Sequence, residues 1–305
     1  MPEFRKLAYD VYAFLQPPLI WYSSSGVIVG ERDVIVVDSL TNATMAQSLR
    51  AEIRGVTDKP IRFLINTHSH ADHVFTNHFF PEATVISTHR GRKETKANQK
   101  VQEKHDALIA KLFSDVDLRG GRYTLQDMSF SGSLSFHHGE REVHVLELGE
   151  GHSESDVVVH LPAERIVFCG DVFMNDMPPL PGEGRVTQTI ANCKGLETLD
   201  ADIYVAGHGD PGTRADVRAQ RTLLESQFQL ARECFDQGLS YDEALQALAG
   251  KGIPLDFQRL IILSSYWEFT GKRPESTDPA SQNHLTILQG VATEARRRLG
   301  RKEPA

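Results

Sequence analysis

The segment Thr67–His73 (THSHADH) constrains this chain more than any other part of its sequence. It directly follows a predicted strand over residues 61–66 and holds three histidines and one aspartate within six residues. Imidazole and carboxylate are the common ligands of borderline divalent metals, zinc above all. His68 and His70 are two residues apart, so in extended backbone they reach one metal from the same side. Asp72 and His73 follow on the next turn, where they can reach a second metal. A solvated polar loop is the alternative, and chance clustering of four such residues is improbable.

Three more candidate ligands occur in similar local surroundings further along the chain. His152, Asp171 and His208 each follow a glycine, which permits a tight turn or a close backbone approach. Each also comes where a predicted strand gives way to a loop; these strands cover residues 143–148, 165–169 and 203–206. A single histidine or aspartate at a strand end is more often structural. Loops at one edge of a sheet can converge, however, so the three residues together indicate one shared site.

Hydrophobic periodicity predicts a mixed α/β body followed by a helical segment. In the body we expect a hairpin of residues 27–30 and 34–38, further strands at 61–66, 83–87, 143–148, 157–161, 165–169 and 203–206, and helices at 43–54 and 89–113. After residue 213 we expect a helix over 214–236, another opened by the capping box Ser240–Glu243, a loop over 271–283 and a last helix over 284–299. These patterns predict a catalytic domain over 1–213 and a helical C-terminal segment over 214–305. The segment either caps the site or forms an oligomer.

Composition excludes several functional classes. Among 305 residues there are 33 Lys and Arg against 41 Asp and Glu, so the formal net charge of −8 argues against nucleic acid or an anionic membrane surface as the main partner. No apolar run approaches the length of a membrane span, and the first residues lack the apolar core of a signal peptide. Three cysteines do not make a disulfide framework. We therefore expect a cytoplasmic protein that acts on a small molecule.

The pattern formed by the seven candidate ligands resembles that of the metallo-β-lactamase fold superfamily of metallohydrolases. The resemblance extends over about residues 10–213. That resemblance implies an α/β fold, an αβ/βα four-layer sandwich with a helical C-terminal extension and a binuclear metal centre. It further implies that metal 1 takes His68, His70 and His152, that metal 2 takes Asp72, His73 and His208, and that Asp171 bridges the two.

The identity of the bridging residue separates branches of this superfamily. The true β-lactamases often carry Cys or Ser where this chain has Asp171, so the full set is more similar to glyoxalase II, lactonases and related ester or thioester hydrolases. Flavodiiron proteins usually carry Glu in place of His70, which counts against a redox di-iron site. The basic residues that bind glutathione in glyoxalase II have no clear match in residues 214–305.

A function follows as an expectation from this ligand set. We expect two divalent ions, Zn²⁺ first and Mn or Fe as alternatives, and a metal-bridging hydroxide that cleaves a carbonyl ester, lactone, thioester or amide. Asp72 would act in catalysis by orienting the hydroxide and carrying its proton to the leaving group. A β-lactamase-type amidase, a metal-dependent lyase or cyclase, and a non-catalytic metal-bearing binding protein remain alternatives.

The sequence identifies the residues that contact the substrate less clearly than it identifies the metal ligands. The candidates flank the motif, precede the first hairpin or follow Asp171; they are Trp21, Tyr22, Phe75, Phe173, Met174 and Arg185, with Met177 as a further wall residue. Core packing is the competing interpretation for the aromatic residues, and packing within the loop is the competing one for residues 172–187. We also expect the C-terminal helices to be able to form a homodimer.

Overall fold

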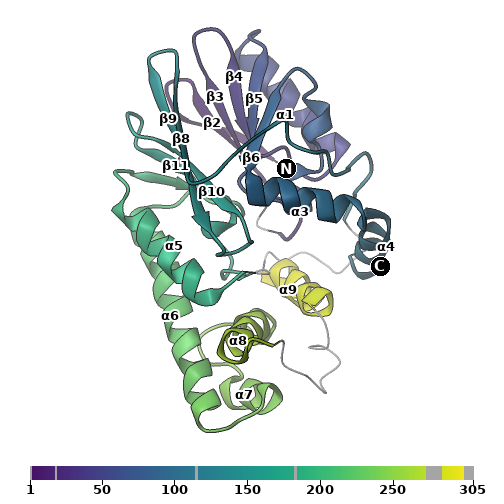
Figure 1. Cartoon of the computed structure of the whole chain (residues 1–305), viewed down its shortest axis with the longest axis vertical. Helices are drawn as coiled ribbons and strands as arrows, with labels where there is room; N and C mark the ends of the chain where they lie inside the picture. The colour runs from purple at the N-terminus through teal and green to yellow at the C-terminus, as the bar shows by residue number, and fades with distance from the viewer. Residues whose placement is uncertain (1, 18, 114–115, 182–183, 273–283, 299–305) are drawn as a thin grey trace.

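Two β-sheets face each other in the computed structural model, which describes residues 2–17, 19–113, 116–181, 184–272 and 284–298 (Figure 1). Within these residues the first sheet has seven strands in the order β1 (Glu3–Ala8), β2 (Val11–Leu15), β3 (Ser25–Val29), β4 (Val34–Val37), β5 (Ile61–Ile65), β6 (Thr84–Thr88) and β7 (Met128–Phe130). The second sheet, also within these residues, has five strands in the order β12 (Ile203–Val205), β11 (Ile166–Phe168), β10 (Asp156–Leu161), β9 (Arg141–Gly149) and β8 (Ser133–His138).

Strand direction explains why loops far apart in the sequence meet at one edge. Strands β4, β5 and β6 are parallel neighbours, so the loops after β4 and β5 leave the first sheet at the same edge. In the second sheet β10 is antiparallel to both β9 and β11, and β11 is parallel to β12. Strands β9, β11 and β12 therefore point the same way, and their following loops also share one edge.

Alternating apolar residues fill the space between the sheets and give the layered architecture. The inner core includes Val11, Ile28, Ile35, Val37 and Ile65 from the first sheet and Val143, Val145, Val157, Val159 and Phe168 from the second. Helix α1 (Ala43–Val56), capped by Asn42, buries Ala46, Leu49 and Ile53 on the outer face of the first sheet. Helix α5 (Val186–Thr198) buries Cys193 and Leu196 on the outer face of the second. This is the expected αβ/βα four-layer sandwich, and the predicted hairpin of β3 and β4 is confirmed.

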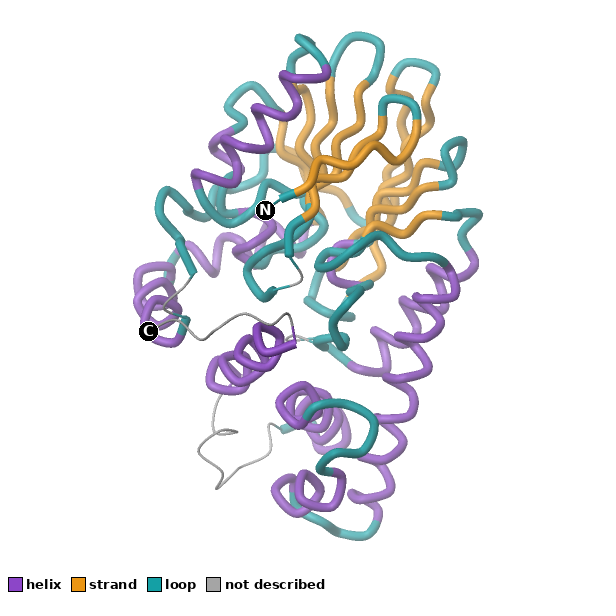
Figure 2. Tube along the Cα trace, turned by 180° about the vertical axis from the view of Figure 1, so that it is seen from behind, coloured by secondary structure: helices purple, strands orange, loops and turns teal. Residues whose placement is uncertain are grey.

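Four helices follow the sandwich and pack beside the edge at which the loops converge (Figure 2). They are α6 (Arg214–Asp236), α7 (Tyr241–Leu248), α8 (Leu255–Thr270) and α9 (His284–Arg298) within the described residues. Helix α6 continues along α5, while α9 lies between α8 and α4 (Gln102–Leu112). The predicted capping box at Ser240 and Glu243 is present. The helices share one apolar cluster that includes Leu224, Leu245, Phe257, Leu260 and Ile261.

Some elements differ from the sequence prediction. The single helix expected over 89–113 is wrong: α3 (His89–Gln99) and α4 are separated at Val101, whose φ of −116° and ψ of 3° are not helical. Helix α3 packs against β6 while α4 packs against α9, and one straight helix does not reach both surfaces. Strands β1, β2, β7 and β8 and the long helices α5 and α8 were not predicted. Most of the predicted loop 271–283 lies outside the described residues.

No helix in the described part of the chain combines the length and the apolar character that a membrane crossing requires.

Candidate metal centre

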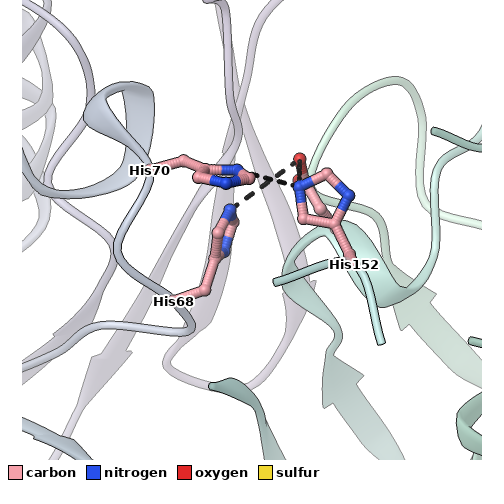
Figure 3. A group of neighbouring side chains, drawn as sticks. His68, His70 and His152 are labelled. Carbon is pink, nitrogen blue, oxygen red and sulfur yellow. Dashed lines mark hydrogen bonds and ion pairs between the residues drawn. The ribbon is translucent and has the colours of Figure 1, made fainter. Parts of the chain in front are cut away.

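All seven predicted ligands lie together at the shared edge of the two sheets. His68 and His70 follow β5, and Asp72 and His73 lie on the short helix α2 (Ala71–Val74). The second sheet supplies His152 after β9, Asp171 after β11 and His208 after β12. Figure 3 shows His68, His70 and His152 pointing toward one another. The ligand atoms form two groups: His68, His70, His152 and Asp171, and Asp72, His73 and His208. Within each group they lie within 4.8 Å of one another.

The carboxylate of Asp171 lies between these two groups. Its Oδ2 is 3.2 Å from Nε2 of His152 and 4.0 Å from Nε2 of His68. Its Oδ1 is 3.2 Å from Nε2 of His73. In the second group, Oδ2 of Asp72 is 3.2 Å from Nε2 of His208. One carboxylate with an oxygen toward each group is the arrangement expected of a bridging ligand.

Three buried atoms without a hydrogen bond indicate that these residues fit divalent metal ions. Nε2 of His68, Nε2 of His73 and Oδ1 of Asp171 are buried and make no hydrogen bond in the structure. Buried polar atoms are rarely left without a partner, because the loss of hydration is not compensated. Nitrogen and carboxylate oxygen donors are also the set that zinc and similar ions accept. The residues present therefore match the metal centre that the sequence implied.

Hydrogen bonds to the other ring nitrogen fix three of the imidazoles. Nδ1 of His152 donates to the carbonyl oxygen of Leu180 at 2.7 Å, and Nδ1 of His208 donates to that of Leu19 at 3.0 Å. Nδ1 of His73 lies 2.8 Å from Oδ2 of Asp38. A proton held on Nδ1 leaves Nε2 as the metal-binding atom and fixes the orientation of the ring.

Asp38 is a functional residue that the sequence analysis missed. Asp38 directly follows β4, its backbone lies in the left-handed region with a φ of 62°, and its side chain is buried. Besides facing His73, its carboxylate accepts hydrogen bonds from the backbone nitrogen of Thr67 at 2.8 Å and from Oγ1 of Thr67 at 2.7 Å. The signal was present in the sequence, because an acid follows the apolar strand at Asp38 much as one follows β11 at Asp171.

Two more acidic side chains support the ligand loops, Glu94 between the loops of the two sheets and Asp156 at the end of the loop that carries His152. Oε2 of Glu94 on α3 accepts from Oγ of Ser69 at 2.9 Å and from Oγ of Ser155 at 2.5 Å. Ser69 belongs to the loop of the first sheet and Ser155 to that of the second, so Glu94 links both. Asp156 accepts from the backbone nitrogen of His152 at 2.6 Å, and burial raises the pKa of Asp156 to about 7.

The acidic and imidazole side chains of the centre shift one another's pKa values. Burial alone would lower the pKa of His73, but the carboxylates of Asp171, Asp72 and Asp38 raise it well above its ordinary value. The same competition raises the pKa of His208 to about 10, mainly through Asp171. Burial would raise the pKa of Asp171, yet His208 and His73 hold it well below its usual range. Buried acids and imidazoles thus stabilise each other here, and a divalent cation would take the place of the shared protons.

Glycine is required at one backbone position next to the centre. A Cβ atom on Gly207 would lie 1.9 Å from Oδ1 of Asp171, a distance that no side chain tolerates. The close backbone approach expected for the glycine before His208 is therefore confirmed.

A cavity of about 550 Å³ opens onto the metal centre. His70, Asp72, His152, Asp171 and His208 form part of its wall. Of the predicted substrate contacts, Trp21 and Met174 line this cavity, as does Met177. Tyr22, Phe75, Phe173 and Arg185 do not line it: Tyr22 packs against the aromatic cluster around Trp21, Phe75 and Phe173 are buried in the core, and Arg185 is largely exposed near Glu150.

Comparisons with known proteins agree with this geometry. Residues 20–208 match the family model described as the metallo-beta-lactamase superfamily. The chain is 26% identical over 232 residues to the 2,4-dinitroanisole O-demethylase subunit alpha of Nocardioides sp. (strain JS1661), covering 73% of this chain and 65% of that relative, slightly less than two thirds of its length.

Solved structures show a similar fold at low sequence identity. A metallo-beta-lactamase from Pontibacter korlensis matches with a TM-score of 0.59 and 18% identity, over 74% of this chain and 99% of that one. The stereoselective inverting sec-alkylsulfatase Pisa1 from Pseudomonas sp. matches with a TM-score of 0.68 and 15% identity, over 98% of this chain and 50% of that one. The sulfatase match therefore extends into the C-terminal helices, whereas the lactamase match covers a smaller share of the chain.

Proposed function

We propose that this chain, which belongs to the metallo-beta-lactamase superfamily, is a binuclear metal-dependent hydrolase that cleaves a carbonyl ester, lactone, thioester or amide of a small molecule. The observation that carries this proposal is the convergence of seven ligand side chains on one edge, with Nε2 of His68 and of His73 buried and without a hydrogen bond. A protein that only binds a ligand does not need so complete a ligand set beside an open cavity.

The ligand assignment follows the two groups of side chains. In the proposal His68, His70 and His152 hold one ion, Asp72, His73 and His208 hold the other, and Asp171 is shared. We propose Zn²⁺ in both positions, with Mn and Fe as ions that the same donor set accepts. When bound, such ions supply Lewis acidity and lower the pKa of water to near 7, which provides a nucleophile at neutral pH.

Asp72 is the residue that we propose to move the proton. It lines the cavity, and its Oδ2 lies 3.2 Å from Nε2 of His208. Burial would raise the pKa of Asp72, but the neighbouring His73 and His208 lower it overall, so the carboxylate is ionised. An ionised carboxylate at this position can orient the attacking water, accept its proton and pass that proton to the leaving group.

A second candidate reaction comes from the O-demethylase relative. Its name describes the cleavage of a methyl ether, so hydrolysis of an aryl methyl ether is the alternative bond type for this chain. Attack of water on such an ether would need the same metal ligands and the same proton carrier. A cytoplasmic location and a homodimer through the C-terminal helices are further proposals that rest on the sequence.

The test is a substrate panel assayed before and after metal removal. The panel contains chromogenic esters, lactones, thioesters, a cephalosporin and a nitroaryl methyl ether. We expect hydrolysis of at least one carbonyl compound, its loss on chelation and its return when Zn²⁺ is added. Turnover of the ether alone would select the second candidate, and turnover of the cephalosporin alone would indicate an amidase. Metal-loaded protein that turns over no member would contradict the hydrolase proposal.

A further inference from the structure

The cavity beside the metal centre has walls of two chemical kinds. Its polar side chains away from the ligands come mostly from α3, α4 and the ligand loops: Ser69, Lys93, Glu94, Asn98, His105 and Glu154. Its apolar side chains come mostly from the segment before β3, the loop after Asp171 and the C-terminal helices: Ile20, Trp21, Met174, Met177, Leu180, Leu260 and Leu288. An occupant of this cavity therefore meets a polar surface on one part and an apolar surface on the other.

The C-terminal helices contribute two leucines to the apolar wall. Leu260 on α8 is fully buried from solvent, and Leu288 on α9 is partly buried. Leu288 packs against two apolar clusters, one among the C-terminal helices and one around Trp21 and Phe75. Both leucines lie beyond residue 208, where the match to the superfamily ends. These two side chains of the wall therefore come from outside the residues that match the superfamily model.

Charge placement limits what can lie against that wall. Among the lining residues that the structure describes, Lys93 alone carries a permanent positive charge, and it lies on α3 next to Glu94. The part of the wall formed by Leu180, Leu260 and Leu288 offers no charged side chain. Burial of an unpaired charge against leucine is strongly unfavourable or forces the charge to be neutralised, so a charged tail is not accommodated there.

We infer that the substrate has a neutral, apolar alkyl or aryl body that lies against Leu260 and Leu288, with its scissile group at the metal centre. This inference rests on the proposed function for the scissile group and on the cavity wall for the body. The volume of about 550 Å³ falls within the roughly 300–1,000 Å³ of pockets that bury small organic ligands. Leu260 and Leu288 are then specificity-determining residues.

Trp21 offers a direct optical probe of this wall. The chain has two tryptophans, Trp21 and Trp267. Trp21 lines the cavity, packs edge-on against Phe113 with ring centroids 5.8 Å apart, and holds a left-handed backbone at φ 73°. Trp267 is 43% exposed and does not line the cavity. In a Trp267→Phe variant the tryptophan fluorescence therefore reports on the cavity alone.

The first experiment measures hydrolysis of 4-nitrophenyl esters with acyl chains of two to ten carbons. We expect kcat/KM to rise about fourfold per added methylene until the cavity is filled, because each buried methylene contributes that much binding. Leu288→Asn should remove most of this rise, so that kcat/KM becomes nearly independent of acyl chain length. Leu255→Ala is the matched control, since Leu255 lies on α8, is partly buried and does not line the cavity.

The second experiment separates the apolar wall from the hydrolase chemistry. The Trp267→Phe protein, as purified, is titrated with 1-octanol and with 8-amino-1-octanol, which carries an ammonium group at the far end of its chain, while Trp21 emission is recorded. We expect a saturable change with 1-octanol at least tenfold tighter than with 8-amino-1-octanol, and loss of that preference in Leu288→Asn. Leu260→Met, nearly equal in volume, should retain it and shows that the leucines act by apolar contact.

The outcomes distinguish the two proposals. Saturable binding of 1-octanol without turnover of any member of the substrate panel would keep the apolar wall and contradict the hydrolase proposal. Ester hydrolysis with no dependence on chain length, or equal binding of 8-amino-1-octanol and 1-octanol, would overturn the inference about the substrate and leave the hydrolase in place.

Discussion

At the scale of single residues, the metal ligands were predictable and their supports were not. His68, His70, Asp72 and His73 stand close together in the sequence, so their shared chemistry is visible before any folding. Asp38 supports His73 from a different strand, and Glu94 contacts Ser69 from a helix. A contact between residues about 30 positions apart depends on tertiary packing, which local patterns do not encode. The same reason explains why only some of the predicted substrate residues line the cavity.

Asp38→Asn tests the support of a ligand by a residue outside the ligand set. Asparagine has one acceptor oxygen where Asp38 has two, so the variant cannot accept hydrogen bonds from both Thr67 and Nδ1 of His73. We expect the affinity for Zn²⁺ to fall about 10- to 100-fold, measured by competition with a chromophoric chelator. Asp33→Asn is the matched control, because Asp33 pairs with His138 away from the ligands. Equal zinc affinity in Asp38→Asn and the wild type would show that this contact does not tune the site.

Asp72→Asn tests the proposed proton carrier. The amide fills the same space and can still offer an oxygen to a metal ion, but it cannot accept a proton. We expect kcat on the best substrate of the panel to fall by about 10²- to 10⁴-fold in protein whose metal content has been checked. Full turnover by a metal-loaded Asp72→Asn protein would assign proton transfer to another group.

At the scale of elements, strand order and helix packing decide where the sequence prediction succeeds. Buried strand β4 is a continuous apolar run and β10 contains three consecutive valines, so both were recognised, as was α6 with its regular apolar spacing. Half of the residues of β1 are charged and the strand lies at the sheet edge, so it gave little signal. The break between α3 and α4 arises because the two helices pack against separate surfaces. The polar sequence of residues 89–113 gives no indication of where that break lies.

Glu94 tests whether α3 holds the two ligand loops together. Glu94→Ala leaves the hydroxyls of Ser69 and Ser155 without their acceptor. We expect the free energy of unfolding to fall by about 1–3 kcal/mol and zinc to dissociate faster. Glu94→Gln, which keeps one acceptor oxygen, should show a smaller effect on both. Thermal unfolding and stopped-flow zinc release would check this, with Glu103→Ala on the exposed face of α4 as the control. Wild-type zinc release in Glu94→Ala would remove the linking role.

His160 on β10 gives a pH dependence with a defined sign. Burial lowers the pKa of His160 below the ordinary 6.5, and its Nε2 donates to the carbonyl oxygen of Asp200 at 3.3 Å. The unfolded chain therefore binds a proton at a higher pH than the folded protein does. This contribution to stability is present above pH 6.5 and is lost as the pH falls below it.

The measurement is urea unfolding of the wild type and of His160→Gln at pH 8, 7, 6 and 5. We expect the free energy of unfolding of the wild type to decrease more steeply below pH 6.5 than that of the variant, with His89→Gln as an exposed control. Parallel curves for wild type and His160→Gln would contradict the burial effect.

At the scale of the whole molecule, the sandwich brings together residues from both halves of the chain. The first sheet supplies four ligands and the second sheet supplies three, so the metal centre joins the two sheets at their common edge. The layered fold was predictable through the resemblance carried by the motif and not from strand patterns alone, because those patterns missed β1, β2, β7 and β8. The position of α8 and α9 beside the cavity was not predictable, since helical periodicity says nothing about which surface a helix will cover.

Bound metal should therefore stabilise the molecule as a whole. A ligand that binds only the folded state at 100 times its dissociation constant adds about 2.7 kcal/mol to the free energy of unfolding. We expect chelation to lower the melting temperature and Zn²⁺ to restore it. A melting temperature that does not respond to chelation of metal-loaded protein would mean that the ions do not join the two sheets.

The most direct test of the binuclear centre is the metal content per chain, measured by elemental analysis of protein purified without chelators and dialysed against trace zinc. The account predicts about two ions per chain in the wild type, and about one in His208→Ala and in His152→Ala, each of which removes a ligand from one group only. One ion or none in the wild type, or two ions retained by both variants, would contradict the proposed seven-ligand binuclear centre.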